Sequence, residues 1–509
     1  MGCRRMAYLR GWRLRGPAGA TMSALDPNAL RSYVARAFVD RIVPLLCEYI
    51  AIPSKSPAFD PNWHDNGHVY RAVSLLALWA KGQPLRNRHI EVYTLPGRTP
   101  VLICDIAGSA AGNVLLYGHY DKQPEFVGWR EGLGPWSPVL EGDRLYGRGG
   151  ADDGYALPSA LVAIEALQAQ GIPHPRCLIL IEGCEESGSP DLPHYMTALA
   201  SRIGVPDLVI ALDAECGSYD RWWITTSLRG LAIGALQVDV LTEGVHSGAA
   251  SGIVPSSFRI VRQLLERIEN MATGEVLAAL SVPIPDSVRT QAAEVAATLG
   301  VETVNRFPMT PGLQPVTSDH TELVLNNTWR AALAVTGAAG LPEPAAAGNT
   351  LHPSTTLKLS MRLPPLLDAQ TAVATLRAEL TRDPPYGATV QYDELGADTG
   401  WWSPNTPDWL RDTIAAASNE HFGAAPRYMG TGGTIPFMKM LGDRFPDVAF
   451  LVTGVLGPHS NAHGPNEFLD VSCAEKVTAC VAQVLAAVPA AQSRAMSPKT
   501  APASGSNQS

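Results

Sequence analysis

The stretch VLLYGHYD, residues 114–121, decides the fold, because an apolar run of strand length ends there in a histidine and an aspartate. Three further apolar runs are followed by polar side chains in the same way, at residues 177–181, 208–212 and 448–452. Continuous apolar strands interleaved with helical patterns are typical of a mixed, mostly parallel sheet that helices cover on both faces. In such a sheet the residues that follow the strands meet at one edge. The sequence therefore predicts an α/β fold with a functional site at that edge.

The order of the predicted elements indicates a catalytic domain interrupted by an inserted one. Helical and strand patterns alternate up to about residue 227, which predicts an α/β sandwich. The next strands have one polar side and are accompanied by two helices, as in a small α+β domain. The predicted parts are a disordered extension at 1–24, a first catalytic part at 25–227, an inserted α+β domain at 228–396, a second catalytic part at 397–490, and a disordered tail at 491–509.

Composition and charge exclude several classes of function. The chain has 509 residues, 46% hydrophobic and 17% charged, as expected for a globular protein of two or three structural units. Its net charge of −9 argues against a nucleic-acid partner. No apolar stretch is expected to be long enough to cross a bilayer. Eight cysteines without a CxxC pair predict reduced core residues and a cytoplasmic location. The Arg-rich start lacks the apolar region of a secretory signal, which leaves Met1 and Met22 as candidate start residues.

Candidate metal ligands follow the apolar runs. In GHYD, the imidazole of His119 can bind a metal while Asp121 hydrogen-bonds its other ring nitrogen and fixes its tautomer. Asp213 ends an otherwise apolar strand, where a carboxylate is costly to bury without a cation or hydrogen-bond donors. His459 and His463 both follow the last run, and their spacing does not tell which of them is the ligand.

Two acidic pairs, Asp152–Asp153 and Glu185–Glu186, complete the candidate set. The first pair follows glycines that permit a sharp turn, through which one carboxylate could approach two cations. A phosphate-binding loop is the alternative, but the segment lacks the spacing of a P-loop and of a dinucleotide site. Adjacent residues in an extended segment point opposite ways, so one glutamate can bind metal while the other is a general base. A solvated acidic turn is the alternative there. Together these residues predict a two-metal hydrolytic site.

These motifs, in this order, resemble those of the family of dinuclear zinc carboxypeptidases, aminoacylases and carnosinase-type dipeptidases. The matching segments, which span roughly residues 46–487, are YGHYDKQPE, DRLYGRGGADDG, EGCEESGS, VHSG, LSMRLPP, GGTIP and AHGPNE. The first segment is most similar to the dipeptidase branch. One departure concerns the loop after the tandem aspartates, where the family usually has D-D-K-G or D-N-K-G and this chain has Gly154 and Tyr155. The missing lysine is not a metal ligand, so the metal site is expected to survive its loss, which bears instead on the packing of the loop and on substrate preference.

The resemblance implies a role for each candidate residue in the catalytic domain. Two divalent metal ions are implied, Zn²⁺ first and Mn²⁺ or Co²⁺ as alternatives. Glu185 becomes the general base and Asp121 the partner of the metal-binding imidazole. The implied ligands are His119, Asp152 and Asp213 for one ion, and Asp152, Glu186 and His463 for the other, with Asp152 as the bridge.

For the inserted domain, the resemblance implies a lid through which two chains form a homodimer. His246, in GVHSG, would reach into the partner subunit's site and stabilise the developing oxyanion. Arg362, in SMRLPP, would clamp a substrate carboxylate, a task that suits a bidentate guanidinium. Thr350 and Thr434 occupy positions that resemble substrate-contacting ones. An ordinary turn histidine and a strand-surface arginine are the alternatives for the first two.

The sequence therefore predicts a metal-dependent exopeptidase that cleaves dipeptides or the C-terminal residue of short peptides. A hydroxide held between the two metal ions would attack the carbonyl, and Glu185 would pass the proton to the leaving amine. The alternatives are an N-acyl-amino-acid deacylase on the same scaffold, and a catalytically silent member that binds peptide. The expected partners are a small peptide or acyl amino acid and a second copy of the chain, with neither nucleic acid nor membrane among them.

Overall fold

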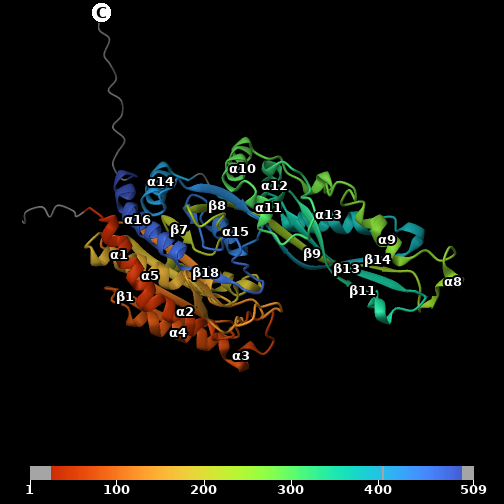
Figure 1. The fold of residues 1–509 in the computed structure, drawn as a ribbon, viewed down its shortest axis with the longest axis horizontal. Helices are drawn as coiled ribbons and strands as arrows, with labels where there is room; N and C mark the ends of the chain where they lie inside the picture. The colour runs from red at the N-terminus through yellow and green to blue at the C-terminus, as the bar shows by residue number, and fades with distance from the viewer. Residues whose placement is uncertain (1–23, 404–405, 496–509) are drawn as a thin grey trace, which may run out of the picture.

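The computed structural model describes residues 24–403 and 406–495, which form two parts (Figure 1). One part is a body in which helices flank a large sheet. The other is an elongated arm, residues 230–280 and 332–398, which is built on a smaller sheet and projects from the body (Figure 1). The candidate start residues Met1 and Met22, nearly all of the predicted extension, and residues 496–509 of the predicted tail lie outside the described residues.

The body sheet has a parallel centre and antiparallel edges. Its strands are β1 (Arg88–Tyr93), β2 (Val101–Ile106), β3 (Asn113–His119), β6 (Arg176–Glu182), β7 (Leu208–Ala211), β8 (Trp223–Leu228), β15 (Trp401–Trp402), β16 (Arg427–Thr431) and β17 (Ala449–Val452). Their order is β1-β2-β6-β3-β7-β17-β8-β15, with β16 paired to β8. The four strands that contain the apolar runs, β6, β3, β7 and β17, are neighbours and run parallel to one another. The predicted mixed α/β fold is confirmed.

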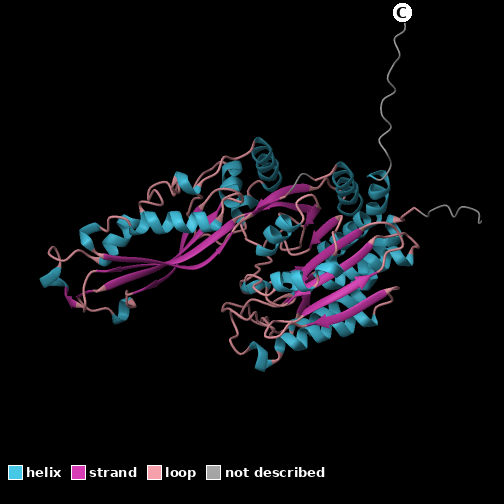
Figure 2. Cartoon of the chain, turned by 180° about the vertical axis from the view of Figure 1, so that it is seen from behind, coloured by secondary structure: helices cyan, strands magenta, loops and turns pink. Residues whose placement is uncertain are grey.

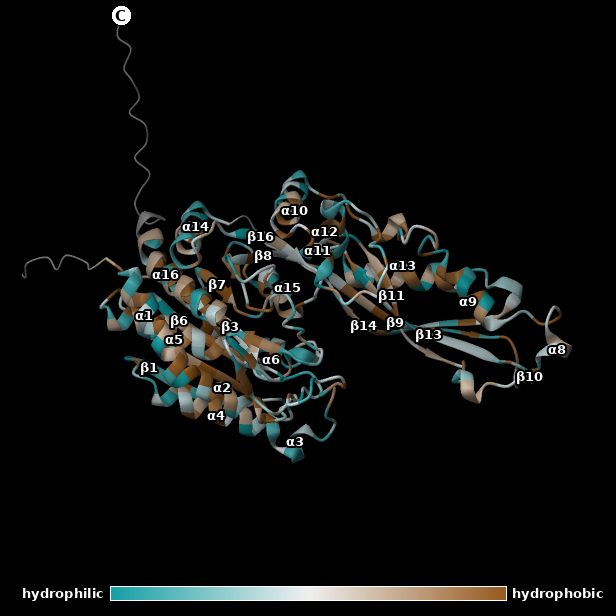
Figure 3. Ribbon diagram, viewed as in Figure 1, coloured by the Kyte–Doolittle hydropathy of each residue, from teal (hydrophilic) through white to brown (hydrophobic). Residues whose placement is uncertain are grey.

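Helices cover both faces of this sheet, because its central strands are apolar on both sides. Along β3, Val114 and Leu116 belong to one hydrophobic cluster, while Leu115 and Tyr117 belong to the other. Figure 3 shows the hydrophobic residues of the body gathered on these central strands. The first cluster packs against α1 (Pro27–Ala37), α2 (Val43–Ile50), α4 (His68–Gly82), α5 (Ala156–Ala169), α14 (Asp408–Phe422) and α16 (Val471–Ala495), and the second against α6 (Leu192–Ala198), α7 (Ala200–Ile203) and α15 (Pro436–Arg444).

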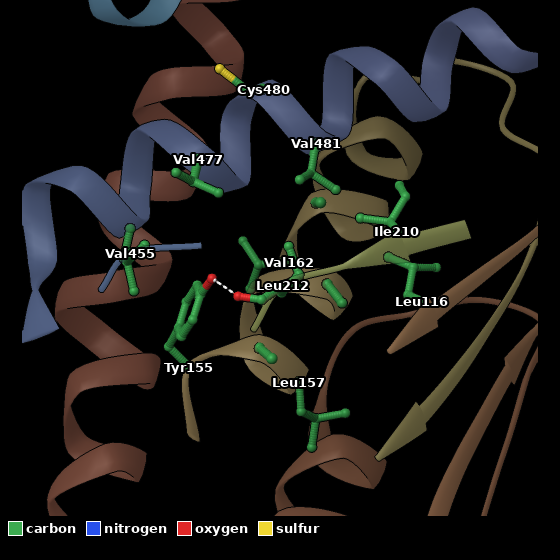
Figure 4. Close-up of a cluster of buried hydrophobic side chains, with 14 of the residues drawn as sticks. Leu116, Tyr155, Leu157, Val162, Ile210, Leu212, Val455, Val477, Cys480 and Val481 are labelled. Atoms are coloured by element: carbon green, nitrogen blue, oxygen red, sulfur yellow. Dashed lines mark hydrogen bonds between the residues drawn. The ribbon is translucent and has the colours of Figure 1, made fainter. Parts of the chain in front are cut away.

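Helix α16 differs in two ways from what the sequence led us to expect. It continues to Ala495, so residues 491–495 are helical and do not belong to a disordered tail. Its segment Val471–Gln492 is also long and apolar enough to span a membrane, so the expectation that no stretch has this length is wrong. In the structure 61% of an apolar 18-residue stretch of that segment is buried, where the helix packs against α5 and α14. Figure 4 shows Val477 and Val481 of this helix facing Ile210 and Val162, which is the arrangement of a core helix.

The arm has its own sheet and its own hydrophobic core. Its strands are β9 (Gly230–Asp239), β11 (Ala332–Ala339), β13 (Ser354–Leu363) and β14 (Thr389–Asp398), in the antiparallel order β11-β13-β9-β14. Burial alternates strictly along β9, because helices α9 (Ser257–Leu265) and α13 (Ala369–Thr381) pack on one face (Figure 2). A short ribbon of β10 (Val245–His246) and β12 (Thr350–Leu351) lies next to α8 (Ser247–Ala250), at the end of the arm that is far from the body (Figure 1).

The middle of the predicted insertion returns to the body. Helices α10 (Asp286–Leu299), α11 (Glu302–Asn305) and α12 (His320–Thr328) pack on one another, and α10 and α12 contact strand β16. Val295 and Leu325 of these helices belong to the first hydrophobic cluster of the body. The predicted domain boundaries at 228 and 396 thus enclose a segment that the structure places against the catalytic sheet.

Candidate metal centre

The parallel strands carry the candidate ligands to one edge of the body sheet. His119 is the last residue of β3, Glu185 and Glu186 begin the turn after β6, and Asp213 lies two residues beyond β7. His463 lies in the loop between β17 and β18 (Phe468–Asp470). Strand β18 forms a small sheet with β5 (Arg144–Tyr146) and β4 (Val139–Glu141), and the loop after β5 carries Asp152. Five side chains thus meet, and the two that lie farthest apart in the sequence, His119 and His463, are separated by 344 positions.

The five side chains form two clusters that share Asp152. In the first, His119 Nε2 lies 3.2 Å from Asp152 Oδ1 and 3.8 Å from Asp213 Oδ2. In the second, His463 Nε2 lies 3.1 Å from Asp152 Oδ2 and 3.3 Å from Glu186 Oε2. Within each cluster the potential ligand atoms lie within 4.8 Å of one another. Because Asp152 presents one oxygen to each cluster, its carboxylate has the placement of a ligand that bridges two cations.

The electrostatics of the cluster favour cations. Burial, together with neighbouring carboxylates, raises the pKa of Asp213 to about 6 and that of Glu186 to about 8. Burial and the charge of Asp213 also raise the pKa of Glu185. Although burial opposes it, hydrogen bonding to the two imidazoles holds the pKa of Asp152 below its usual value. Crowded buried carboxylates of this kind need compensating positive charge. Imidazole nitrogens and carboxylate oxygens at this spacing fit two divalent ions such as Zn²⁺.

Asp121 organises both the histidine and the glutamates. One of its carboxylate oxygens lies 3.4 Å from His119 Nδ1, the ring nitrogen that faces away from Asp152. The two oxygens also accept hydrogen bonds from the backbone N–H groups of Glu185 and Glu186, each at 3.0 Å. The carboxylate thus lies beside the imidazole as expected, but the hydrogen bond of Nδ1 is formed with the backbone carbonyl of Asp121, at 3.1 Å. The second contact, which sets the turn of the glutamate pair, could not be read from an H-x-D spacing.

The loop that carries Asp152 depends on glycines where the backbone meets neighbouring side chains. At Gly149 φ is +83°, and a Cβ there would lie 2.5 Å from Lys122 Cε. At Gly154, the position of the absent family lysine, a Cβ would lie 2.4 Å from Tyr49 Cε1. The ring of Tyr49 therefore fills the space beside this loop, and the ammonium of Lys122 lies 3.9 Å from the centroid of that ring. A side chain at 154 has no room here, which gives the departure from the family pattern a packing reason.

Three residues that the sequence analysis did not single out support the ligands. Gln123 Nε2 donates to Glu186 Oε2 at 2.6 Å. Arg148 and Glu467 form an ion pair that is almost completely buried. Glu467 also accepts from the backbone of Gly149 at 2.9 Å, and Arg148 donates to the carbonyl of Gly464 at 2.7 Å. The pair thus ties the Asp152 loop to the His463 loop. Arg148 and Glu467 lie within the family segments GRGGADDG and AHGPNE, so the family resemblance could have identified them.

The four predicted substrate residues separate into two groups. Near the body, Arg362 donates to Thr434 Oγ1 at 3.1 Å, and the Thr434 hydroxyl donates to the carbonyl of Arg229 at 2.6 Å. At the far end of the arm, His246 and Thr350 are opposite each other in the β10–β12 ribbon. Figure 1 shows how far this ribbon lies from the strand ends of the body. One chain therefore places only the first group beside its own body.

Arg229 is a further buried arginine that the sequence analysis did not single out. Only 7% of it is exposed, and its guanidinium donates to the backbone carbonyls of Gly432, Asn326 and Arg330 at 3.1 to 3.3 Å. Burial and the nearby charge of Arg362 lower the pKa of Arg229 to about 10. Its contacts hold the GGT loop, residues 432–434, against the start of the arm.

Known proteins are similar to this chain in sequence and in fold. Residues 115–487 match the profile of peptidase family M20/M25/M40. A cysteinylglycine-S-conjugate dipeptidase of Corynebacterium striatum is 26% identical over 400 residues, which are 74% of this chain and 81% of its own length. A β-Ala-His dipeptidase of Homo sapiens is 26% identical over 421 residues, 79% of this chain and 81% of its own. The structure of Dug1p, a dipeptidase of Saccharomyces cerevisiae, superposes with a TM-score of 0.75 at 18% identity, and the match covers 91% of this chain and 98% of that one.

Proposed function

The chain belongs to peptidase family M20/M25/M40, and we propose that it is a metal-dependent dipeptidase that cleaves dipeptides or the C-terminal residue of short peptides. Its membership confirms the family resemblance and the prediction of a metal-dependent hydrolase. The relatives described above carry the names of dipeptidases, which supports dipeptides over acyl amino acids as substrates.

The observation that carries the proposal is the carboxylate of Asp152, shared between two ligand clusters. When bound, the two ions would polarise the substrate carbonyl and lower the pKa of the attacking water. Zn²⁺ is the proposed metal, with Mn²⁺ or Co²⁺ as alternatives. Glu185 follows the β6 strand beside the ligand Glu186, and its backbone is held by Asp121. We assign it the general-base role: it takes the proton of the attacking water and delivers it to the leaving amine.

The substrate's carboxylate is the proposed partner of Arg362. This guanidinium is half-buried, and Thr434 accepts one of its hydrogen bonds. A planar guanidinium with remaining N–H groups can bind a carboxylate through two parallel hydrogen bonds. Such a clamp sets the distance between the terminal carboxylate and the scissile bond, so it selects peptides that end near the metal centre.

We also propose a homodimer in which the arm of each chain completes the other's site. The His246 side chain is exposed and is paired with Thr350 at the far end of the arm. His246 of the partner subunit would stabilise the oxyanion that forms in the transition state. A cytoplasmic location is proposed as well, supported by the seven cysteines of the described residues, which are all free.

Substrate profiling of the metal-loaded protein tests the proposal. The purified chain, loaded with Zn²⁺, Mn²⁺ or Co²⁺, is assayed with Cys-Gly, β-Ala-His, Ala-Leu and the N-acetyl derivatives of leucine and methionine. We expect hydrolysis of at least one dipeptide and a kcat/KM for it well above that of any acyl amino acid. Hydrolysis of the acyl amino acids alone would assign the chain to the deacylases. No hydrolysis with metal bound would make it a silent, peptide-binding member.

A further inference from the structure

A cavity of about 300 Å³ lies where the arm joins the body. Its walls come from helices α10, α11 and α12, the loop between α11 and α12, and strand β16. They are largely apolar, and their side chains include Leu299, Val304, Phe307, Met309 and Met429. A pocket of this volume and lining suits an apolar side chain of the size of leucine or phenylalanine.

The lining of the cavity includes neighbours of the metal centre along the chain and of the proposed carboxylate clamp in the sheet. Glu215 lines it and stands two residues beyond the ligand Asp213. Ala332, also in the lining, is opposite Arg362 in the pairing of β11 with β13. Arg229 lines the cavity too, and its carbonyl accepts the hydrogen bond of Thr434, the residue to which Arg362 donates.

The charged groups of the cavity make contacts within the protein, although Arg306 Nε and Thr303 Oγ1 are buried there without a hydrogen-bond partner. The guanidinium of Arg229 donates to three backbone carbonyls. Arg306 lies 4.0 Å from Glu215 and 3.5 Å from the side-chain oxygen of Asn327. Apart from Arg306 Nε, an acidic side chain would have to compete with these contacts and lose its hydration, whereas an apolar one would meet the hydrophobic walls.

We propose that this cavity selects the side chain of the substrate's C-terminal residue and favours large apolar residues there. The inference rests on the proposed function, because it takes Arg362 as the clamp for the terminal carboxylate. In a peptide, the Cα that carries that carboxylate also carries the C-terminal side chain. A carboxylate held at Arg362 therefore places this side chain beside the neighbouring cavity.

Kinetics with a matched pair of variants test the inference. The metal-loaded enzyme is assayed with Ala-Gly, Ala-Leu and Ala-Phe, which share the N-terminal residue. We expect kcat/KM for Ala-Leu to exceed that for Ala-Gly roughly tenfold or more. Val304→Trp, which fills the cavity, should remove at least most of this preference. The control is Val301→Trp on the same short segment, since Val301 is 63% exposed and does not line the cavity. It should keep the wild-type preference.

A binding measurement separates failure of the inference from failure of the proposed function. Calorimetry with metal-loaded Glu185→Gln reports binding without turnover, and Ala-Leu should bind roughly tenfold or more tightly than Ala-Gly. If no dipeptide is cleaved but this difference is found and Val304→Trp removes it, the pocket stands and the catalytic proposal falls. Equal binding of Ala-Leu and Ala-Gly would overturn the pocket. The pocket would also be overturned if Val304→Trp weakened the binding of Ala-Leu and Ala-Gly by the same factor.

Discussion

Asp121 is the residue on which the order of the site most depends. It lies 3.4 Å from His119 Nδ1 and accepts the backbone N–H groups of the glutamate pair. We expect Asp121→Asn to weaken metal binding by roughly 10–100-fold, because loss of such an outer partner frees the orientation of the ligand. Competition with a chelator measures the affinity. Asp105→Asn is the matched control, since Asp105 pairs with Arg176 in the body sheet and touches no ligand. Unchanged affinity in Asp121→Asn would refute the role.

Glu185 is the residue whose chemistry is most open to test. The Glu185→Gln variant keeps the size of the side chain but cannot accept the proton of the attacking water. We expect kcat to fall by roughly 10²–10⁴-fold with two metal ions still bound, since general-base catalysis contributes about that much. Metal content is measured on the same preparation. Glu141→Gln, at a half-exposed side chain, serves as the control and should retain activity. Full turnover in the first variant would make Glu185 a structural residue.

The candidate residues could be identified from the sequence, but their division of labour could not. The spacing left His459 and His463 equivalent, because both lie in an irregular loop with no period to orient them. The family resemblance pointed to His463. In the structure His463 Nε2 lies 3.3 Å from Glu186 Oε2, whereas His459 is exposed and belongs to neither cluster. To choose between the two histidines one must know the path of the loop, and this path depends on tertiary contacts such as those of Glu467.

At the scale of elements, the Arg148–Glu467 pair holds two loops together. Both side chains are at most 1% exposed. We expect Arg148→Met to lower the free energy of unfolding by about 3–5 kcal/mol, because it leaves an uncompensated buried carboxylate. The midpoint of denaturant unfolding measures this change. Arg130→Met, at the half-exposed pair with Glu141, is the control and should shift the midpoint far less. Equal shifts in both variants would show that the buried pair has no special structural weight.

The strands could be predicted more completely than the helices of the insertion. The apolar runs at 114–117 and 177–181 are short enough for strands, and a sheet covered on both faces buries every side chain of such a run. By contrast, α10 and α12 carry apolar residues on one side, and that pattern does not say which surface they cover. They pack on β16 of the body, although the chain around them builds the arm. The partner of an amphipathic helix is a tertiary property.

At the scale of the whole molecule, the arm separates groups that one reaction needs. Arg362 lies at the end of β13 nearest the body, paired with the start of β9, while His246 and Thr350 lie in the separate β10–β12 ribbon beyond the other end of this sheet. The sheet between them is continuous and carries its own hydrophobic core, so it is expected to act as a rigid spacer. If both ends serve catalysis, they serve two different sites.

This geometry predicts that two inactive variants restore each other. In a mixed dimer of His246→Ala with Glu185→Gln, the site of the first chain keeps its own Glu185 and receives an intact His246 from the second chain. Random reassociation of equal amounts would make half of the dimers mixed, so about a quarter of the sites should be active. The measurement is kcat per site after the variants are mixed, dissociated and reassociated, with each variant reassociated alone as the control. Recovery demands that His246 act in trans, because a histidine acting within its own chain would leave every site of the mixture defective.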